Sequence, residues 1–447
     1  MSGMPLRAAA TAFVLTATSL PGLAAEAPPS AADPQVTRIV AAIQDERLLA
    51  DVKRLAGFGT RNLFSETASE TRGTGAARRF LAESLRAASP RMQVTLDSHR
   101  LAPQGDRILR AVELVNVVGV LPGRTQRRLL VAGHYDSVAK GPDGEFHWDQ
   151  GDLPAPGAND DGSGTPAVLE LARVLGGESL DATVVFVLFD GEEEGLVGST
   201  LYAARAAKYR EPIEGVLSND IIGNEVGGSG RVANRVLHLF SADPHDSPAR
   251  ELARYAEWIG EAFVPGLDVR PIFRYDRFGR GGDHTPFEAN GIAAVRFTVS
   301  EEDYSRQHDV RDSVEGISPR YLGDATRVNA ATLASLALAP ARPVVADEKG
   351  RPLLERGASG YDAHLRWRLD DPPDDLAGFE ILARDTTAPR WERSWWVPAE
   401  AREHLLAGIS IDGVTLGVRA VDRGGHRSLA GVYVYPRRVL PEYRLQP

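Results

Sequence analysis

The sequence predicts an α/β fold with a mostly parallel central sheet flanked by helices, followed by a small all-β sandwich. The chain has 447 residues, of which 43% are hydrophobic, and this is more than one hydrophobic core normally holds. Short apolar runs alternate with amphipathic stretches up to about residue 340, a pattern typical of a parallel sheet covered on both faces. Beyond that point Trp, Tyr, Val and paired prolines become frequent, which favours strands and turns.

The first 25 residues have the pattern of a secretory signal peptide. Arg7 precedes an apolar stretch that ends in small residues, including Ala24 and Ala25, as such peptides do. The stretch is short, rich in Ala and Thr, and interrupted by Pro21, so it suits a transmembrane anchor less well. We therefore expect a cleaved signal peptide at residues 1–25 and a secreted or periplasmic mature protein.

A single α/β unit is expected over residues 30–340. Apolar residues at three- and four-residue spacing predict helices, and short runs rich in β-branched residues predict strands. The expected helices are 36–57, 71–88, 164–177, 247–263 and 318–339, and the expected strands lie within 111–123, 127–137, 182–193, 213–224 and 291–300.

A second unit is expected over residues 345–440. Strands within 363–384, 391–399 and 414–436, separated by turn residues, predict a β-sandwich. Trp367 and the segment 416–428 resemble parts of a fibronectin type III domain. Most of its aromatic and charged residues are expected to be ordinary core and surface, and contact with a polymer, a cell surface or another protein is the open alternative.

Composition narrows the choice of partners and chemistry. The formal net charge is −10 and the basic residues are scattered, so the sequence lacks the basic patch that binds nucleic acid. No segment after the signal peptide is apolar enough for stable membrane insertion. The chain has no cysteine, which excludes disulfides, thiolate metal sites and cysteine nucleophiles. Any metal must be held by His, Asp and Glu.

Residues of the metal-ligand type follow three of the predicted strands. One strand ends in His134 and Asp136, the next in Glu192 and Glu193, and a third in Asp220. Because the carboxyl ends of parallel strands meet at one edge of a sheet, where ligands bind, we expect these residues to be neighbours.

Asp160 and Asp161 lie between turn-forming glycines at the start of the helix predicted at 164–177. Acidic residues in this position cap a helix and interact well with its dipole, but they are also suitable metal ligands. Taken alone, the motif leaves both interpretations open.

These motifs together resemble those of the M28 family of zinc aminopeptidases. The matching motifs are His134 and Asp136 in HYDS, Asp160 in GANDDGSG, the glutamate pair in GEEEGLVGS, Asp220 in NDIIGN and His308 in YSRQHDVRDS. They occur in the family's order and approximate spacing over most of residues 100–340, which makes the resemblance specific. It implies a three-layer zinc-peptidase fold and an exopeptidase, in first place an aminopeptidase that hydrolyses N-terminal residues from peptides; with the signal peptide, this predicts a secreted enzyme.

The resemblance also implies two zinc ions per chain. It makes Asp160 the bridging ligand, with His134 and Asp220 completing one site and Glu193 and His308 the other. Zn²⁺ accepts imidazole and carboxylate ligands, and paired ions in hydrolases lie close enough to share a carboxylate.

Further roles follow from the same resemblance. Glu192 is implied to be the general base for a metal-activated water, and Asp136 to hold the imidazole of His134. Consecutive residues that leave a strand point in different directions, so Glu192 and Glu193 can serve different functions. Glu194 is expected to be solvated or to start a helix. The peptide bond between Asp160 and Asp161 is implied to be cis.

Two positions depart from the family pattern. Gln307 stands where related enzymes often have a tyrosine that stabilises the oxyanion, and Tyr304 is the nearest tyrosine. Gly282 stands where the family usually has a serine in a Ser-Asp-His sequence. We expect the next two residues, Asp283 and His284, to buttress the site rather than to bind metal.

Other functions stay open at this point. A carboxypeptidase, a dipeptidase or an amidohydrolase could use the same dinuclear site. Glutaminyl cyclases share the fold but have a single zinc and lack part of the ligand set, and a catalytically inactive binding protein would be expected to have lost ligands. The complete ligand set favours the exopeptidase.

Overall fold

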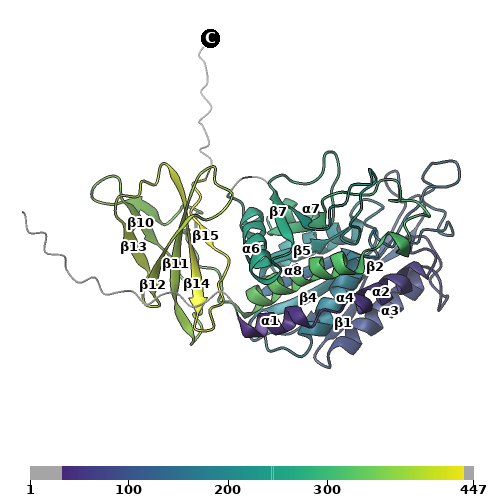
Figure 1. Ribbon diagram of the computed structural model, residues 1–447, viewed down its shortest axis with the longest axis horizontal. Coiled ribbons are helices and arrows are strands. Elements are labelled where there is room, and N and C mark those ends of the chain that lie inside the picture. The colour runs from purple at the N-terminus through teal and green to yellow at the C-terminus, as the bar shows by residue number, and fades with distance from the viewer. Residues whose placement is uncertain (1–32, 243, 245, 437–447) are drawn as a thin grey trace, which may run out of the picture.

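The computed structural model describes residues 33–436, apart from residues 243 and 245. The predicted signal peptide at 1–25 lies outside the described residues. The described chain forms an α/β part, built on one large sheet, and an all-β part that lies beside it (Figure 1).

The large sheet has eight strands in the order β1-β2-β4-β3-β5-β8-β6-β7. Four of its seven pairings are parallel, including those that join the central strands β4, β3, β5 and β8. The predicted α/β fold with a mostly parallel sheet is therefore confirmed. The strands are β1 (Gln93–Leu101), β2 (Val112–Leu121), β3 (Arg128–His134), β4 (Thr183–Phe189), β5 (Ile213–Asn219), β6 (Val236–Phe240), β7 (Asp268–Ile272) and β8 (Ala294–Val299).

Helices cover both faces of the sheet. Alternate residues of a central strand therefore pack into two separate hydrophobic cores, one on each face. In β4, Val184 and Phe186 pack in a core with α1, α2, α3, α4, α6 and α8, whereas Val185 and Val187 pack against α5 and α7. The helices are α1 (Pro34–Ala41), α2 (Asp45–Ala56), α3 (Gly73–Ala88), α4 (Gly164–Leu175), α5 (Val197–Tyr209), α6 (Pro248–Phe263), α7 (His284–Ala289) and α8 (Pro319–Leu338), with one turn of 3₁₀ helix, η1 (Val314–Gly316).

The expected elements agree with the structure except at a few places. The helix expected at 36–57 is two helices, since the backbone N–H of Gln44 leaves the helical pattern and donates to the buried Glu170 carboxylate at 2.9 Å. In the α/β part, strands β1, β6 and β7 and helices α5 and α7 were not expected. The other predicted helices and strands are present.

The all-β part consists of two antiparallel sheets, β13-β10-β9 and β12-β11-β14-β15, that share one hydrophobic core around Trp367 and Phe379. Its strands are β9 (Leu354–Arg356), β10 (Ala363–Arg366), β11 (Leu376–Asp385), β12 (Arg393–Pro398), β13 (Glu403–Leu406), β14 (Val414–Asp422) and β15 (Gly431–Val432). The fibronectin likeness and the division into units at 30–340 and 345–440 stay predictions.

The two parts meet along α6. The guanidinium of Arg390 binds the carboxylates of Glu257 and Glu261 at 2.6 Å, and the Tyr255 hydroxyl donates to the Arg427 carbonyl at 2.9 Å. Leu429 of the all-β part packs into the main core of the α/β part. Among the described helices, none combines the length and apolar character needed to cross a membrane.

Candidate metal centre

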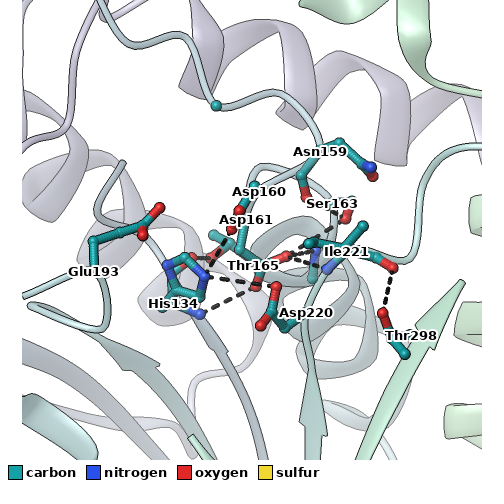
Figure 2. A network of polar contacts seen from close by, with 12 residues as sticks. His134, Asn159, Asp160, Asp161, Ser163, Thr165, Glu193, Asp220, Ile221 and Thr298 are labelled. Carbon is teal, nitrogen blue, oxygen red and sulfur yellow. Dashed lines mark hydrogen bonds and ion pairs between the residues drawn. The ribbon is translucent and has the colours of Figure 1, made fainter. Parts of the chain in front are cut away.

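Three neighbouring strands bring their C-terminal ends to one edge of the sheet. His134 is the last residue of β3, Glu193 follows β4, and Asp220 follows β5. Their side chains gather near Asp160, which comes from the loop before α4 (Figure 2). The convergence expected from a parallel sheet therefore occurs.

The converging residues form two groups that share Asp160. In the first group, His134 Nε2 lies 3.2 Å from Asp160 Oδ1 and 3.7 Å from Asp220 Oδ1. In the second group, His308 Nε2 lies 3.1 Å from both Asp160 Oδ2 and Glu193 Oε2. Each group could hold one metal ion. The five ligands predicted from the sequence are thus brought together, with one Asp160 oxygen facing each group.

Asp136 connects the two groups from behind. Its Oδ1 lies 3.3 Å from His134 Nδ1, and its Oδ2 accepts a hydrogen bond from the Glu193 backbone N–H at 3.0 Å. A carboxylate on the outer nitrogen of an imidazole fixes the tautomer and the ring orientation of a metal ligand. This geometry is the one expected for Asp136.

The two residues of the aspartate pair have different surroundings. The Asp160 side chain faces the histidines, whereas Asp161 accepts backbone hydrogen bonds from Gly164 at 2.7 Å, His134 at 3.1 Å and Ile221 at 3.3 Å. Asp161 therefore ties the start of α4 to the ends of β3 and β5. The peptide bond between Asp160 and Asp161 is cis, as the resemblance implied.

Two buried residues that support this loop were not expected from the sequence. Asp312 accepts the backbone N–H groups of Asn159 and Asp160, each at 3.0 Å, and burial raises its pKa to about 7. Arg61 is fully buried and donates to the carbonyls of Tyr135, Pro156 and Gly157. The sequence offered one sign of a role for Asp312, which is its position four residues after His308, and none for Arg61.

The glutamates that follow β4 point to different surroundings. Glu193 pairs with His308, whereas Glu192 is partly buried, and His134 and Asp220 are its main electrostatic neighbours. Burial, opposed by His134, raises the pKa of Glu192 well above its usual range. Such a shift suits a proton carrier better than a permanent anion.

Glu194 differs from its prediction. It is only 6% exposed, and α5 begins three residues later at Val197, so it is neither solvated nor a helix start. Burial, and then the nearby Asp136 and Asp190, raise the pKa of Glu194 well above its usual range. Burial and the two neighbouring aspartates thus disfavour the charged form of Glu194.

The remaining predicted residues differ in whether they contact the two metal-binding groups. Gln307 Nε2 donates to Asp160 Oδ2 at 2.9 Å, so it touches the shared carboxylate. Tyr304 is 66% exposed and lines an adjacent cavity of about 480 Å³. His284 is buried, with Nε2 3.0 Å from the Tyr275 carbonyl, and Asp283 is buried beside it. Neither belongs to the two metal-binding groups.

A loop with aromatic residues lies over the second group. The ring of Phe146 meets that of His308 edge-on at 5.6 Å and stacks on Trp148 at 4.7 Å. Arg107 lies over Trp148 and donates to the Glu193 carbonyl. The sequence did not single out these aromatic residues.

The donor atoms fit a metal pair. His134 Nε2, Glu193 Oε1 and Asp220 Oδ1 are buried and have no hydrogen-bond partner among the described residues, a costly condition for a polar atom unless a ligand binds it. Although burial opposes it, Glu193 and Asp160 raise the pKa of His308 to about 11. The same negative field would attract dications. Imidazole and carboxylate donors in this number match zinc.

Comparison with known sequences agrees with the site. The model of peptidase family M28 matches residues 116–333. A "probable zinc metalloprotease" of Leptosphaeria maculans is 32% identical over 439 residues, covering 91% of this chain and 98% of the relative. Another, of Pyricularia oryzae, is 34% identical over 426 residues, covering 87% of this chain and 82% of the relative. The chain belongs to peptidase family M28, as its motifs predicted.

Solved structures agree on the fold. The LapA aminopeptidase of Legionella pneumophila has a TM-score of 0.52 at 16% identity, covering 68% of this chain and 75% of that one. The glutaminyl cyclase of Porphyromonas gingivalis has a TM-score of 0.53 at 18% identity, covering 65% and 98%. At these identities the likeness establishes the fold alone, and it does not separate an aminopeptidase from a cyclase.

Proposed function

We propose that this chain is a secreted dinuclear zinc exopeptidase, specifically an aminopeptidase that releases N-terminal residues from peptides. The observation that carries the proposal is the sharing of Asp160 between two groups of three ligands. A single carboxylate with one oxygen toward each group is what a pair of closely spaced ions requires. A mononuclear site would need only one of these groups.

The chain's residues would divide the work of binding zinc. His134 and Asp220 would hold one ion, Glu193 and His308 the other, and Asp160 both. Asp136 would keep the His134 imidazole in the tautomer that leaves Nε2 free to bind. When bound, the zinc pair supplies Lewis acidity at the scissile carbonyl and makes a nearby water easier to deprotonate.

Glu192 would carry the proton. It takes a proton from the attacking water and passes it to the leaving amine, so the peptide bond breaks without a covalent intermediate. The raised pKa of Glu192 supports this role, because a carboxyl that holds a proton more readily can both accept a proton and return it. Gln307, hydrogen-bonded to Asp160, is within reach of the centre as a neutral donor.

A substrate panel tests the proposal. The zinc-loaded protein is offered aminoacyl-anilides, amino-blocked peptides, free dipeptides and peptides with N-terminal glutamine. We expect hydrolysis of the aminoacyl-anilides and of peptides with a free amine. Preference for amino-blocked peptides would indicate a carboxypeptidase or amidohydrolase, exclusive cleavage of dipeptides a dipeptidase, and release of a cyclised glutamine a glutaminyl cyclase. Zinc binding without any turnover would indicate a binding protein.

Secretion is the second part of the proposal. Its basis is the N-terminal sequence pattern alone, which lies outside the described residues. N-terminal sequencing of the mature protein should find a start between Ala25 and Pro28. A mature chain that keeps residues 1–25 would contradict export by a cleaved signal peptide.

For the all-β part we propose contact with a polymer, a cell surface or another protein. The exposed rings of Tyr361 and Tyr435 support a surface function. Co-sedimentation of the full chain with cell-wall polymers, compared with a Tyr361→Ala, Tyr435→Ala variant, tests the polymer alternative. Equal sedimentation of the two proteins would argue against it.

A further inference from the structure

Arg296 is a fully buried charge in the middle of β8. Its exposed fraction is 0%, although all its neighbours along this strand except Thr298 are apolar. A buried guanidinium is costly unless carboxylates and hydrogen bonds compensate for the lost water. Arg296 has two such partners. One nitrogen lies 2.9 Å from Asp220 Oδ2, and the other lies 3.4 Å from each oxygen of Asp276.

The pairing with Arg296 gives the two carboxylate oxygens of Asp220 different surroundings. Oδ2 is held by Arg296, whereas Oδ1 has no hydrogen-bond partner among the described residues and lies 3.7 Å from His134 Nε2. Arg296 therefore leaves only one oxygen of this carboxylate directed at the position that His134 and Asp160 share. A freely rotating Asp220 could instead turn both oxygens inward or neither.

Gly282 provides the space that the Arg296 side chain occupies. A Cβ at this position would lie 3.2 Å from Arg296 Cδ and 3.3 Å from His284 Nδ1, tighter than ordinary contacts. Gly282 is not among the residues with positive φ, so its backbone does not require glycine. The absence of a side chain is explained by the arginine packed against it.

Among the residues that the structure describes, no arginine binds a side-chain oxygen of the second metal-binding group in this way. Glu193 pairs with His308 through Oε2, and its Oε1 has no partner within the described part of the chain. Arg107 reaches only the main-chain carbonyl of Glu193. Arg296 therefore acts on the His134–Asp220 position and not on the Glu193–His308 position.

We propose that Arg296 is a positioning residue that sets the zinc affinity of the His134–Asp220 position, and that Gly282 makes room for it. The inference rests on the two-zinc function proposed above. Asp276 also pairs with Arg277, whose Nε lies 2.9 Å from Asp276 Oδ1. Asp276 therefore keeps a partner when Arg296 is removed, and the main effect is to free the Asp220 carboxylate. Partners behind a metal ligand typically change metal affinity by about 10- to 100-fold.

The test is competition for zinc with a chromophoric chelator. We expect Arg296→Lys and Arg296→Met to weaken one of the two zinc ions by about 10- to 100-fold and to leave the other unchanged. Gly282→Ala should weaken the same ion by a smaller factor. Lysine keeps the charge but not the two-pronged geometry, and it keeps the test valid if the methionine variant fails to fold.

Three controls separate positioning from general damage. Arg419→Lys alters an arginine paired with buried Glu380 in the all-β part, and it should leave both zinc affinities unchanged. On an Asp220→Asn background, Arg296→Lys should have no further effect on zinc, whereas on a Glu193→Gln background its effect should persist. Unfolding midpoints of the zinc-free variants show whether each protein is folded.

The outcomes are distinguishable. A folded Arg296→Lys variant that binds two zinc ions with wild-type affinities, or that weakens both equally, would overturn this inference and leave the proposed function intact. A wild-type chain that binds fewer than two zinc ions would overturn both.

Discussion

Replacing Glu192 with glutamine should abolish turnover while both zinc ions stay bound. Glutamine keeps the size of the side chain but cannot take a proton from water. Loss of a general base typically costs about 10²- to 10⁴-fold in rate, or about 2.7–5.5 kcal/mol in the activation barrier. The ligand distances support the zinc prediction, because the two metal-binding groups include Glu193 and not Glu192. Glutamine keeps the volume of this partly buried side chain, so folding should hardly change.

Glu193→Gln is the matched comparison, one residue away in the same loop. Its Oε2 lies 3.1 Å from His308 Nε2, so this variant should lose affinity at one zinc position. The assay measures zinc content and kcat together for both variants on an aminoacyl-anilide. If Glu192→Gln lost zinc while Glu193→Gln kept it, the roles would be reversed. If both kept a near-normal kcat, neither residue would be catalytic.

Three further predictions concern ligand sharing and charge. Asp160→Asn should weaken both zinc positions in a chelator titration, and loss of only one would contradict sharing. Burial raises the pKa of Glu288 to about 8, so the stability this group contributes is complete below about pH 4.5 and lost as pH rises through 8. Glu288→Gln should then stabilise by about 3 kcal/mol at pH 8.5, allowing for partial exposure, and little at pH 4.5, measured by urea unfolding. Despite burial, Asp422 and Asp33 raise the pKa of His426 above its usual value. The stability that His426 contributes is complete below about pH 6.5 and is lost as the pH rises above the pKa of the folded state. His426→Gln should therefore lower the free energy of unfolding by about 2 kcal/mol at pH 5.5 and by less at pH 9. An equal effect at both pH values would refute the ion pair.

The sequence predicts the centre of the fold because burial on both faces leaves a clear pattern. Strand β4 is apolar at every position after its first and ends at the acidic loop, so its place beneath the site follows from sheet geometry. Edge strands carry less information. β1 contains only exposed and partly exposed residues. It is a strand because it pairs with β2, and the residues of β1 alone do not predict that pairing.

Tertiary contacts account for the other differences. The break between α1 and α2 depends on the Glu170 carboxylate, which is 126 residues away from Gln44 in the sequence. No local pattern contains that contact. The burial of Glu194 also depends on tertiary contacts. A third consecutive glutamate is normally solvated, but the turn after β4 buries this one.

The metal-ligand types and Asp136, which lies behind His134, were predictable, but Arg296, Arg61 and Asp312 were not. His, Asp and Glu at strand ends indicate chemistry by type. Arg296 in the apolar strand β8 left a trace, a charge among buried apolar residues, but its partner Asp276 comes from a loop whose position depends on the folded sheet. Arg61 and Asp312 act on backbone groups, and such contacts leave no pattern of residue types.

The most direct test of the central claim is the zinc content of the wild-type chain, measured by metal analysis after reconstitution and exhaustive dialysis against metal-free buffer. Two groups of ligands sharing Asp160 predict two zinc ions per chain, and removal of both by a strong chelator should abolish hydrolysis, with recovery when zinc is returned. One zinc ion per chain in a fully active enzyme would contradict the dinuclear centre and direct the interpretation to a mononuclear enzyme.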